Sequence, residues 1–510
     1  MNRIIEHLPI LVILFPLVAT VLCHLAGHFS IALSKKIVIS ALLVSVVCAA
    51  LQLVQVVKTG QPVRYFIGGW APPFGIEFVI DGLNGVIVLL VAVASWATAL
   101  FSSPFETLER EKTAVRSCGY YSMLSFLSLG LLGMASTGDA FNLYVFMEIT
   151  AISGYGLIAI GERKGPIAAF RYLLTGTIGA SMYLLGAGFL YSATGTLNMA
   201  DLAETVKDLD GSPLIILSVG CMIVGFGIKM ALFPLHGWQP AAHSYAHPAA
   251  DPMIAGVMIK VPAYAMLRFF FFIFKEESMV MDMFFDVIGV MAVCGILFGS
   301  LKALRYSTYN KILAYSSIGQ VGYIAMGFAI GNFYGLTGAV LHIVSHAFMK
   351  SGLFYTSGAL KYKFGIHETT QLGQVYRQMP VTSLTMTVCA LSMIGLPPFA
   401  GFFSKWYLAL GAIENGQYLF VAVLIASSLL SAIYFFRVFE KLFMESKTAF
   451  ERKDTAALME KSAVGRRLEL PWQLMIPMLV VIAAVILLGL FNSYIVDDIL
   501  RPAIMEGALS

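Results

Sequence analysis

Four lysines lie inside stretches of the chain that are otherwise apolar enough for a lipid bilayer: Lys229, Lys260, Lys350 and Lys405. Three further ionisable residues share this setting: Glu148, His342 and His346. A cation at the bilayer centre costs roughly 2.5–3.5 kcal/mol even on insertion-based scales, so such residues rarely occur unless they face a protein interior or a wet path. Their types suit proton binding and release, and the set predicts a row of proton-binding sites in a chain that moves ions.

Glu148 lies about two and a half turns into a predicted helix that begins near Asp139. One interpretation is a carboxylate kept neutral by burial. The other is a member of an ion path, since lone acids in spanning helices typically mark such paths. Asp139, near the predicted membrane surface, is interpreted as a helix N-terminal acid or a subunit contact.

Lys229 precedes a proline-rich stretch with Pro234, Pro240, Pro248 and Pro252. These prolines cannot all belong to one unbroken helix, because each removes a backbone donor and clashes with the preceding turn. We therefore expect a discontinuous helix, which at membrane depth is typical of ion sites in transporters. The alternative is a lysine that snorkels to the surface.

His342, His346 and Lys350 follow one another at i, i+4 and i+8, so one helical face carries all three, about 6 Å apart per step. Histidine suits proton transfer near pH 7. The pattern predicts a proton wire; a metal site and an inert polar seam are the alternatives. Lys260 lies two residues before Pro262, in the middle of an apolar run, where a buried amine can accept and release a proton.

Lys405 follows the segment GLPPFAGFFS, whose Pro-Pro pair and glycines interrupt a second apolar span. Two spans therefore look broken, and each carries a lysine beside its break.

The elements that must position these residues are membrane helices. Of the 510 residues, 58% are hydrophobic and only 12% are charged, about half the charged fraction of soluble domains. Runs of about 20 apolar residues predict fourteen spans. They lie near 8–27, 36–57, 79–101, 118–136, 140–160, 167–193, 213–236, 252–274, 283–301, 309–330, 332–359, 381–412, 417–443 and 472–492.

Nothing is left for a soluble domain, and the longest polar connection runs from about Lys447 to Leu470. The first run, Leu8 to Gly27, has no small-residue cleavage site after a basic region, which predicts a retained helix. The net charge of +4 comes with no basic stripe suited to nucleic acid.

Lysines and arginines are unevenly divided between the predicted loops. Loops after odd-numbered spans hold 22 of the 33, the even loops and both ends hold 7, and the intramembrane lysines are the remaining four. The positive-inside rule then predicts cytoplasmic odd loops and both termini outside, in a prokaryotic cell membrane.

Six cysteines occur singly with no CxxC spacing, which argues against iron–sulfur or zinc ligation. There is no GxGxxG or GxxxxGK[ST] pattern for nucleotide binding. We therefore expect no cofactor and no redox centre in this chain, and an ion gradient or partner subunits as the source of energy.

Five motifs resemble those of the antiporter-like subunits shared by respiratory complex I, membrane-bound hydrogenases and Mrp-type cation/proton antiporters. They are FNLYVFMEITAISGYGL, GFGIKMALFPLHGWQPAAHSYAHP, ILAYSSIGQVGYI, HIVSHAFMKSGLF and GLPPFAGFFSKW, within about residues 75–445. The resemblance implies fourteen helices, with helices 4–8 and 9–13 as two repeats of opposite topology and helices 7 and 12 discontinuous. The matching division of the chain is 1–117, 118–274, 275–447 and 448–510.

The resemblance also implies roles for the ionisable residues. Glu148 and Lys229 match the family's carboxylate–lysine pair, and Lys260 matches its central relay lysine. His342 and His346 match the bridging positions of helix 11. Lys405 matches the terminal proton-exchange lysine. Lys350 is a candidate relay member, and His243 and His247 are candidates for lining a water path.

The position of Lys405 also bears on the subtype, because the M-type subunit of complex I carries glutamate there. L- and A-type subunits have long C-terminal extensions that this chain lacks. The favoured interpretation is a D-type Mrp subunit in which proton movement is coupled to Na+/H+ exchange, assembled with sister and small membrane subunits. The alternative is a proton- or sodium-pumping subunit of a redox-driven complex. A stand-alone transporter and a partner in inorganic-carbon uptake are two further classes.

Overall fold

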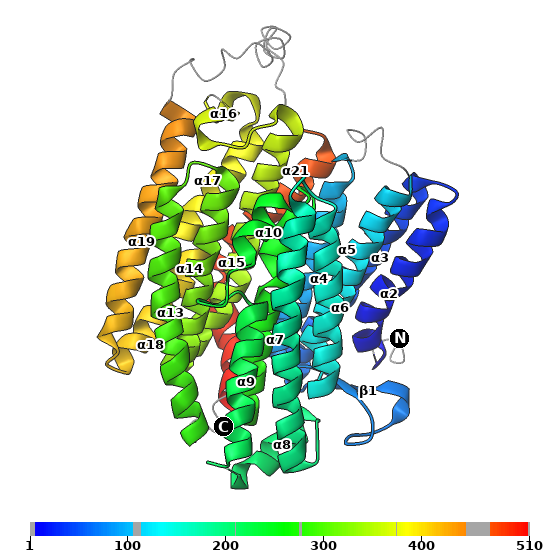
Figure 1. Cartoon of the computed structure of the whole chain (residues 1–510), viewed down its shortest axis with the longest axis vertical. Helices are drawn as coiled ribbons and strands as arrows, with labels where there is room; N and C mark the ends of the chain where they lie inside the picture. Colours follow the sequence, from blue (N-terminus) through cyan, green and yellow to red (C-terminus); the bar gives the residue numbers. More distant parts are fainter. Residues whose placement is uncertain are drawn as a thin grey trace.

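The computed structural model describes residues 6–105, 114–209, 211–274, 278–373, 375–444 and 470–507. Nearly all of the described elements are helices that stand side by side along the long axis (Figure 1). Eleven helices of this part of the chain are long and apolar enough to cross a membrane. The predicted all-helical membrane fold is confirmed.

The chain begins with three long helices and a small hairpin. The helices are α2 (Leu8–Gly27), α3 (Ile31–Thr59) and α4 (Gly82–Ser102). The antiparallel strands β1 (Val63–Phe66) and β2 (Glu77–Ile80), with the short η1 (Ile67–Gly69), connect α3 to α4, and Val63 pairs with Ile80. Asp81 caps α4 by accepting the backbone N–H groups of Leu83 and Asn84, which fixes where that helix starts.

A set of five spans follows. It consists of α5 (Ala114–Ser136), α6 (Ala140–Ala159), α7 (Gly165–Thr194), the pair α9 (Pro213–Lys229) and α10 (Gln239–Tyr245), and the run of α11 (Asp251–Met253), η4 (Ile254–Met258) and α12 (Lys260–Ile273). The short helices α8 (Met199–Thr205) and η3 (Val206–Asp208) connect α7 to α9.

A second set repeats this plan. It consists of α13 (Met279–Arg305), α14 (Tyr309–Ile330), α15 (Phe333–Phe364), the pair α17 (Pro380–Ile394) and α18 (Ala400–Glu414), and α19 (Tyr418–Phe439) with η6 (Glu440–Met444). The short η5 (Thr369–Gln371) and α16 (Val375–Gln378) connect α15 to α17. The last elements are α21 (Trp472–Leu490), α22 (Asn492–Tyr494), η8 (Ile495–Leu500) and α23 (Arg501–Gly507).

The fourteen predicted spans all correspond to helices. Three of them are not among the eleven continuous apolar helices: the two broken spans, α9–α10 and α17–α18, and α15. The predicted discontinuities of helices 7 and 12 are confirmed, and α15 is the helix that carries the two histidines and Lys350. The predicted polar connection from Lys447 lies outside the described residues up to Leu470, and the division into four segments stays a prediction.

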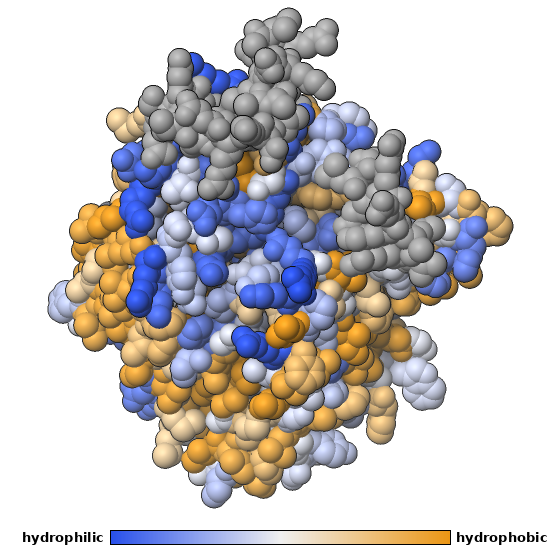
Figure 2. All heavy atoms as spheres, turned by 45° about the horizontal axis from the view of Figure 1, so that its top comes forward, coloured by the Kyte–Doolittle hydropathy of each residue, from blue (hydrophilic) through white to orange (hydrophobic). Residues whose placement is uncertain are grey.

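Successive spans alternate in direction, and the two sets begin five spans apart, so corresponding helices of the two sets run in opposite directions. The described parts of the loops after odd-numbered spans therefore lie at the end of the bundle where α16 lies, here called the upper face. The hairpin and α8 lie at the opposite end, the lower face (Figure 1). Hydrophilic residues gather at the centre of the upper face, and hydrophobic ones cover much of the surrounding surface (Figure 2).

The interior of the bundle is formed by α14, α15 and the α11–α12 run, which are almost completely enclosed. In contrast, α2, α3, α19 and α21 expose much of their apolar surface, as expected for helices that face lipid. The enclosed helices carry most of the ionisable residues singled out from the sequence.

Candidate functional site

The first break places a carboxylate and an ammonium in contact. Lys229 is the last residue of α9, and its Nζ lies 3.1 Å from Oε1 of Glu148, in the middle of α6. The Lys229 side chain is 3% exposed and that of Glu148 is 28% exposed. The ammonium is therefore inside the bundle, and the carboxylate approaches its lateral surface. The C-terminal end of a helix also favours a cation.

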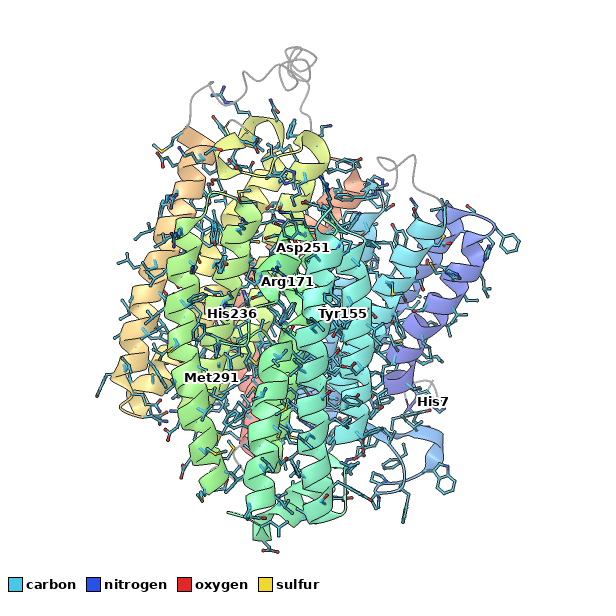
Figure 3. The ribbon with its side chains drawn as sticks, in the orientation of Figure 1. His7, Tyr155, Arg171, His236, Asp251 and Met291 are labelled. Atoms are coloured by element: carbon cyan, nitrogen blue, oxygen red, sulfur yellow. The ribbon has the colours of Figure 1, made fainter. Side chains whose placement is uncertain are left out.

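Aromatic packing holds this break in place. The Trp238 Nε1–H donates to the carbonyl of Ile228, 2.9 Å away, and Tyr172 of α7 stacks on the Trp238 ring with centroids 3.8 Å apart. His236 lies in the interrupted segment near mid-height of the bundle (Figure 3), stacked on Phe233. The chain between α9 and α10 is thus a defined structure whose conformation fixes the end of α9.

Lys260 follows a π-helical turn, η4, of a kind that often occurs at functional sites. It is fully buried, and its Nζ donates to the carbonyl of Ala255. A Cβ on Gly256 would lie 2.0 Å from Oγ of Ser351, so η4 approaches α15 closely at this glycine. The approach brings the Lys260 ammonium within electrostatic reach of His346 and Lys350.

The polar face of α15 is completely enclosed. The rings of His342 and His346 stack with centroids 5.5 Å apart, and His342 Nδ1 lies 2.9 Å from Oγ of Ser404 on α18. His342 Nε2 and both ring nitrogens of His346 have no protein partner within the described residues. Buried polar atoms of this kind commonly bond to ordered water, which is also the medium of proton transfer.

Lys350 ends this row on α15. Its Nζ donates to the carbonyl of Leu313, 2.7 Å away, and to Oγ of Ser316, 2.6 Å away. Both partners belong to α14. The ammonium is therefore held by neutral oxygens.

Lys405 lies against the second break. Its Nζ donates to the carbonyls of Met393 and Ile394 at the end of α17, at 3.0 and 2.9 Å, and to Oγ of Ser428, 3.1 Å away. It also lies over the Tyr323 ring, 5.0 Å from the centroid, and that ring contacts His342 with centroids 5.4 Å apart. Tyr323 thus connects the second break to the histidines.

The geometry divides the predicted relay into two groups. Lys229 and Glu148 form one group at the first break. The other group consists of Lys260, His342, His346, Lys350 and Lys405. Among the described residues no direct contact joins Lys229 to Lys260. In the same part of the chain, no three His, Cys, Asp or Glu side chains converge as metal ligands would.

The two candidate path-lining histidines have different surroundings. His243 of α10 is fully buried, and its Nδ1 lies 2.8 Å from Oδ1 of Asp251. The ring of His247 lies among aromatic rings, with that of Tyr120 5.2 Å away between centroids. The structure therefore brings His243 into a polar pair and His247 into an aromatic cluster.

Asp251 was missed from the sequence. The signal that could have found it is an acid at the very start of a predicted span, after a proline-rich stretch. It lies above His236 in the bundle (Figure 3). Towards the upper face, Lys361 of α15 pairs with Glu162 at 3.0 Å, and both charges reach Asp251. Nearby, burial and then the Lys361 charge lower the pKa of His367.

Comparison with known proteins supports one family. Residues 137–431 match the family described as NADH:quinone oxidoreductase/Mrp antiporter, transmembrane. The chain is 43% identical to NADH-quinone oxidoreductase subunit N of Desulforudis audaxviator (strain MP104C) over 502 residues, with 98% of each chain covered. It is 31% identical to the D-type subunit of the Na+/H+ antiporter of Alkalihalophilus pseudofirmus over 510 residues, again with 98% of each covered.

The fold is also shared with a solved structure. A chain of the membrane-bound sulfane sulfur reductase, an archaeal respiratory membrane complex, superposes with a TM-score of 0.87 at 30% identity, covering 98% of each chain.

Proposed function

Because the chain belongs to the NADH:quinone oxidoreductase/Mrp antiporter transmembrane family, we propose that it is the proton-translocating subunit of a multisubunit membrane complex. Protons would move through Glu148, Lys229, Lys260, the α15 face and Lys405. The relatives described above are named as subunits of such assemblies, which argues against a stand-alone transporter.

The observation that carries this proposal is the set of buried lysines without carboxylate partners. Lys260, Lys350 and Lys405 are held by backbone carbonyls and serine hydroxyls in the described structure. Neutral oxygens accept a hydrogen bond from an ammonium without fixing its charge, whereas a buried carboxylate would fix it. Such lysines are suited to bind a proton and to release it again.

In this proposal the Glu148–Lys229 ion pair at the first break couples proton movement to charges in a neighbouring subunit. Separation of Glu148 from Lys229 would remove the charge that stabilises the Lys229 ammonium and so favour proton transfer towards Lys260. The partly exposed Glu148 carboxylate faces the side of the bundle, where a sister subunit could supply a competing positive charge. Charge coupling between such sites is strong in a low-dielectric interior.

The step from Lys229 to Lys260 would need bridging water, since no side chain in the described residues connects them directly. Access from the upper face is supported by the Glu162–Lys361 pair above the buried Asp251–His243 pair. In this scheme His243 lines the path and Asp251 holds its imidazole in place.

The orientation follows from the loop charges. In the sequence, the loops after odd-numbered spans hold 22 lysines and arginines. The described parts of these loops lie at the upper face, so we place that face in the cytoplasm and both termini outside. No cofactor is assigned to this chain.

The proton movement could be driven by Na+/H+ exchange or by electron transfer. The sequence motifs favoured Na+/H+ exchange, and that preference is not confirmed. Identity is 43% to a relative named as an NADH-quinone oxidoreductase subunit and 31% to one named as an antiporter subunit. This difference supports the redox-driven alternative, and we propose an electron-transfer complex as the assembly.

The test uses the assembled complex in sealed vesicles with a pH-sensitive dye. Na+ is added in one trace and a respiratory electron donor in another, and both are repeated with Lys229→Ala. We expect a pH change on addition of the donor that Lys229→Ala abolishes. A response to Na+ alone would assign the chain to an exchanger, and unchanged traces with Lys229→Ala would refute the relay.

A further inference from the structure

A buried polar seam runs from Lys260 towards the lower face. Tyr264 and Arg268 follow Lys260 at i+4 and i+8, so all three lie along one side of α12. The rise along the helix places Arg268 about 12 Å below Lys260 and within two turns of the end of α12. Tyr264 is 2% exposed, and its hydroxyl interacts with the Asn84 side chain of α4.

An ion pair closes the lower end of this seam. Arg268 Nη1 donates to Oδ2 of Asp81, and the two side chains are only 17% and 19% exposed. The guanidinium also lies over the Phe272 ring, 4.0 Å from the centroid. Arg268 lies within α12 and within the eighth predicted span, near 252–274.

Asp81 is itself held rigidly. Its Oδ1 accepts the backbone N–H groups of Leu83 and Asn84, both at 2.9 Å, while the Asn84 side chain accepts the Asp81 N–H at 2.7 Å. The C-terminal segment η8 packs on the start of α4, so a Cβ on Gly82 would lie 3.0 Å from the Ile499 carbonyl. The Arg268 guanidinium is therefore held in one position by the rigidly placed Asp81 carboxylate.

The seam creates a problem for a proton-conducting chain. Polar side chains extend from Lys260 in two directions, along Tyr264 to Arg268 and towards α15. A proton that escaped along the seam would leave the chain without reaching His342, His346 or Lys405.

We propose that the Arg268–Asp81 pair is an electrostatic barrier that prevents protons from leaving the relay at Lys260 towards the lower face. A fixed positive charge in a narrow polar path excludes protons and other cations. Arginine suits this role because it stays protonated at every physiological pH, whereas a lysine could itself relay the proton. Arg268 is thus a positioning residue that directs protons towards Lys405. This inference rests on the proposed function.

The experiment measures passive proton leak separately from driven transport. Vesicles containing the assembled complex trap a pH dye, potassium and valinomycin clamp the membrane potential, and an external pH step is applied without Na+ or electron donor. With Arg268→Gln we expect the leak rate to rise about tenfold, because the fixed charge is gone. Adding Lys260→Met to Arg268→Gln should return the leak to the wild-type rate.

Two variants act as controls. Arg64→Gln removes the cationic partner of the buried Glu77 near the same face, where Arg64 Nη1 lies 3.7 Å from Glu77 Oε2, and should leave the leak unchanged. In Arg268→His the imidazole is charged at acidic pH and neutral at alkaline pH. The proton leak of this variant should therefore be small at pH 5 and large at pH 8. This pH dependence decides the question if Arg268→Gln does not assemble.

The outcomes separate the barrier from the proposed function. A wild-type leak with Arg268→Gln, or a leak that survives Lys260→Met, would overturn the barrier and leave an ordinary structural ion pair between α4 and α12. Full driven transport with Lys229→Ala would instead refute the proposed function, whatever the leak.

Discussion

At the residue scale, neutral oxygens of the backbone and of serine side chains hold the buried lysines and histidines of the proposed relay. Buried lysines and histidines are conspicuous in apolar runs because burial of charge is costly. Their partners here are carbonyls such as those of Leu313 and Met393, and hydroxyls such as that of Ser404. Such groups carry no sequence signal, since every residue has a carbonyl and serine is common. Asp251 was not predicted for a related reason, because its contact with His243 depends on how α10 and α11 pack together.

The Asp251–His243 pair gives a prediction at this scale. Asp251→Asn keeps the shape of the side chain but removes the charge that faces His243 Nδ1, 2.8 Å away. If the pair passes protons inward from the upper face, driven transport should fall by at least about tenfold, the lower range for a positioned proton-transfer group.

The rate of donor-driven acidification or alkalinisation in vesicles measures this effect. Asp497→Asn is the matched control, because Asp497 pairs with Arg501 in an exposed position and should not change the rate. Wild-type transport with Asp251→Asn would exclude the pair from the path.

At the element scale, proline and glycine made both broken helices predictable. Each proline lacks a donor, and the breaks fall beside Lys229 and before Lys405 as expected. The π-helical turn η4 was not predicted, because its residues Ile254–Met258 contain no proline and read as ordinary helix. Gly256, in the middle of this turn, lies directly against Ser351 of α15, a contact between distant parts of the chain that no local pattern indicates.

Gly395 gives a prediction for the second break. Its φ of 95° lies in a region that other residues rarely adopt, and a Cβ there would lie 3.0 Å from Cδ of Lys405. Gly395→Ala should therefore cost about 1–3 kcal/mol in backbone strain and displace the Lys405 ammonium from its carbonyls.

We expect slower driven transport with this variant and a lower melting temperature of the purified complex. Gly365→Ala is the control for strain alone, because its φ is 65° but no atom lies within 4 Å of its Cβ position. Equal transport rates for the two variants would show that the contact with Lys405 does not matter.

At the scale of the whole molecule, span number and alternation were predictable because hydropathy is a strong local signal. The enclosure of α14 and α15 by other helices was not, since it depends on how the two five-helix sets pack together. The same global arrangement determines that charged loops gather at one face, and this makes the orientation testable.

Thiol labelling in a Cys294→Ser background tests the orientation, since Cys294 is the exposed cysteine among the described residues. Glu204→Cys at the lower face should react with an impermeant maleimide in intact cells. Thr370→Cys at the upper face should react only after permeabilisation. The reverse pattern would invert the proposed topology.

The proposed function requires protons to cross this chain through the enclosed row of lysines and histidines. The most direct measurement is the rate of donor-driven pH change in vesicles containing the assembled complex with Lys260→Met, which keeps much of the side-chain volume but cannot carry a proton. Lys311→Met is the control, because Lys311 lies over the Tyr306 ring, 5.3 Å from its centroid, away from the row. We predict a loss of more than about tenfold for Lys260→Met alone. A wild-type rate with Lys260→Met in a fully assembled complex would show that protons do not cross the chain through Lys260.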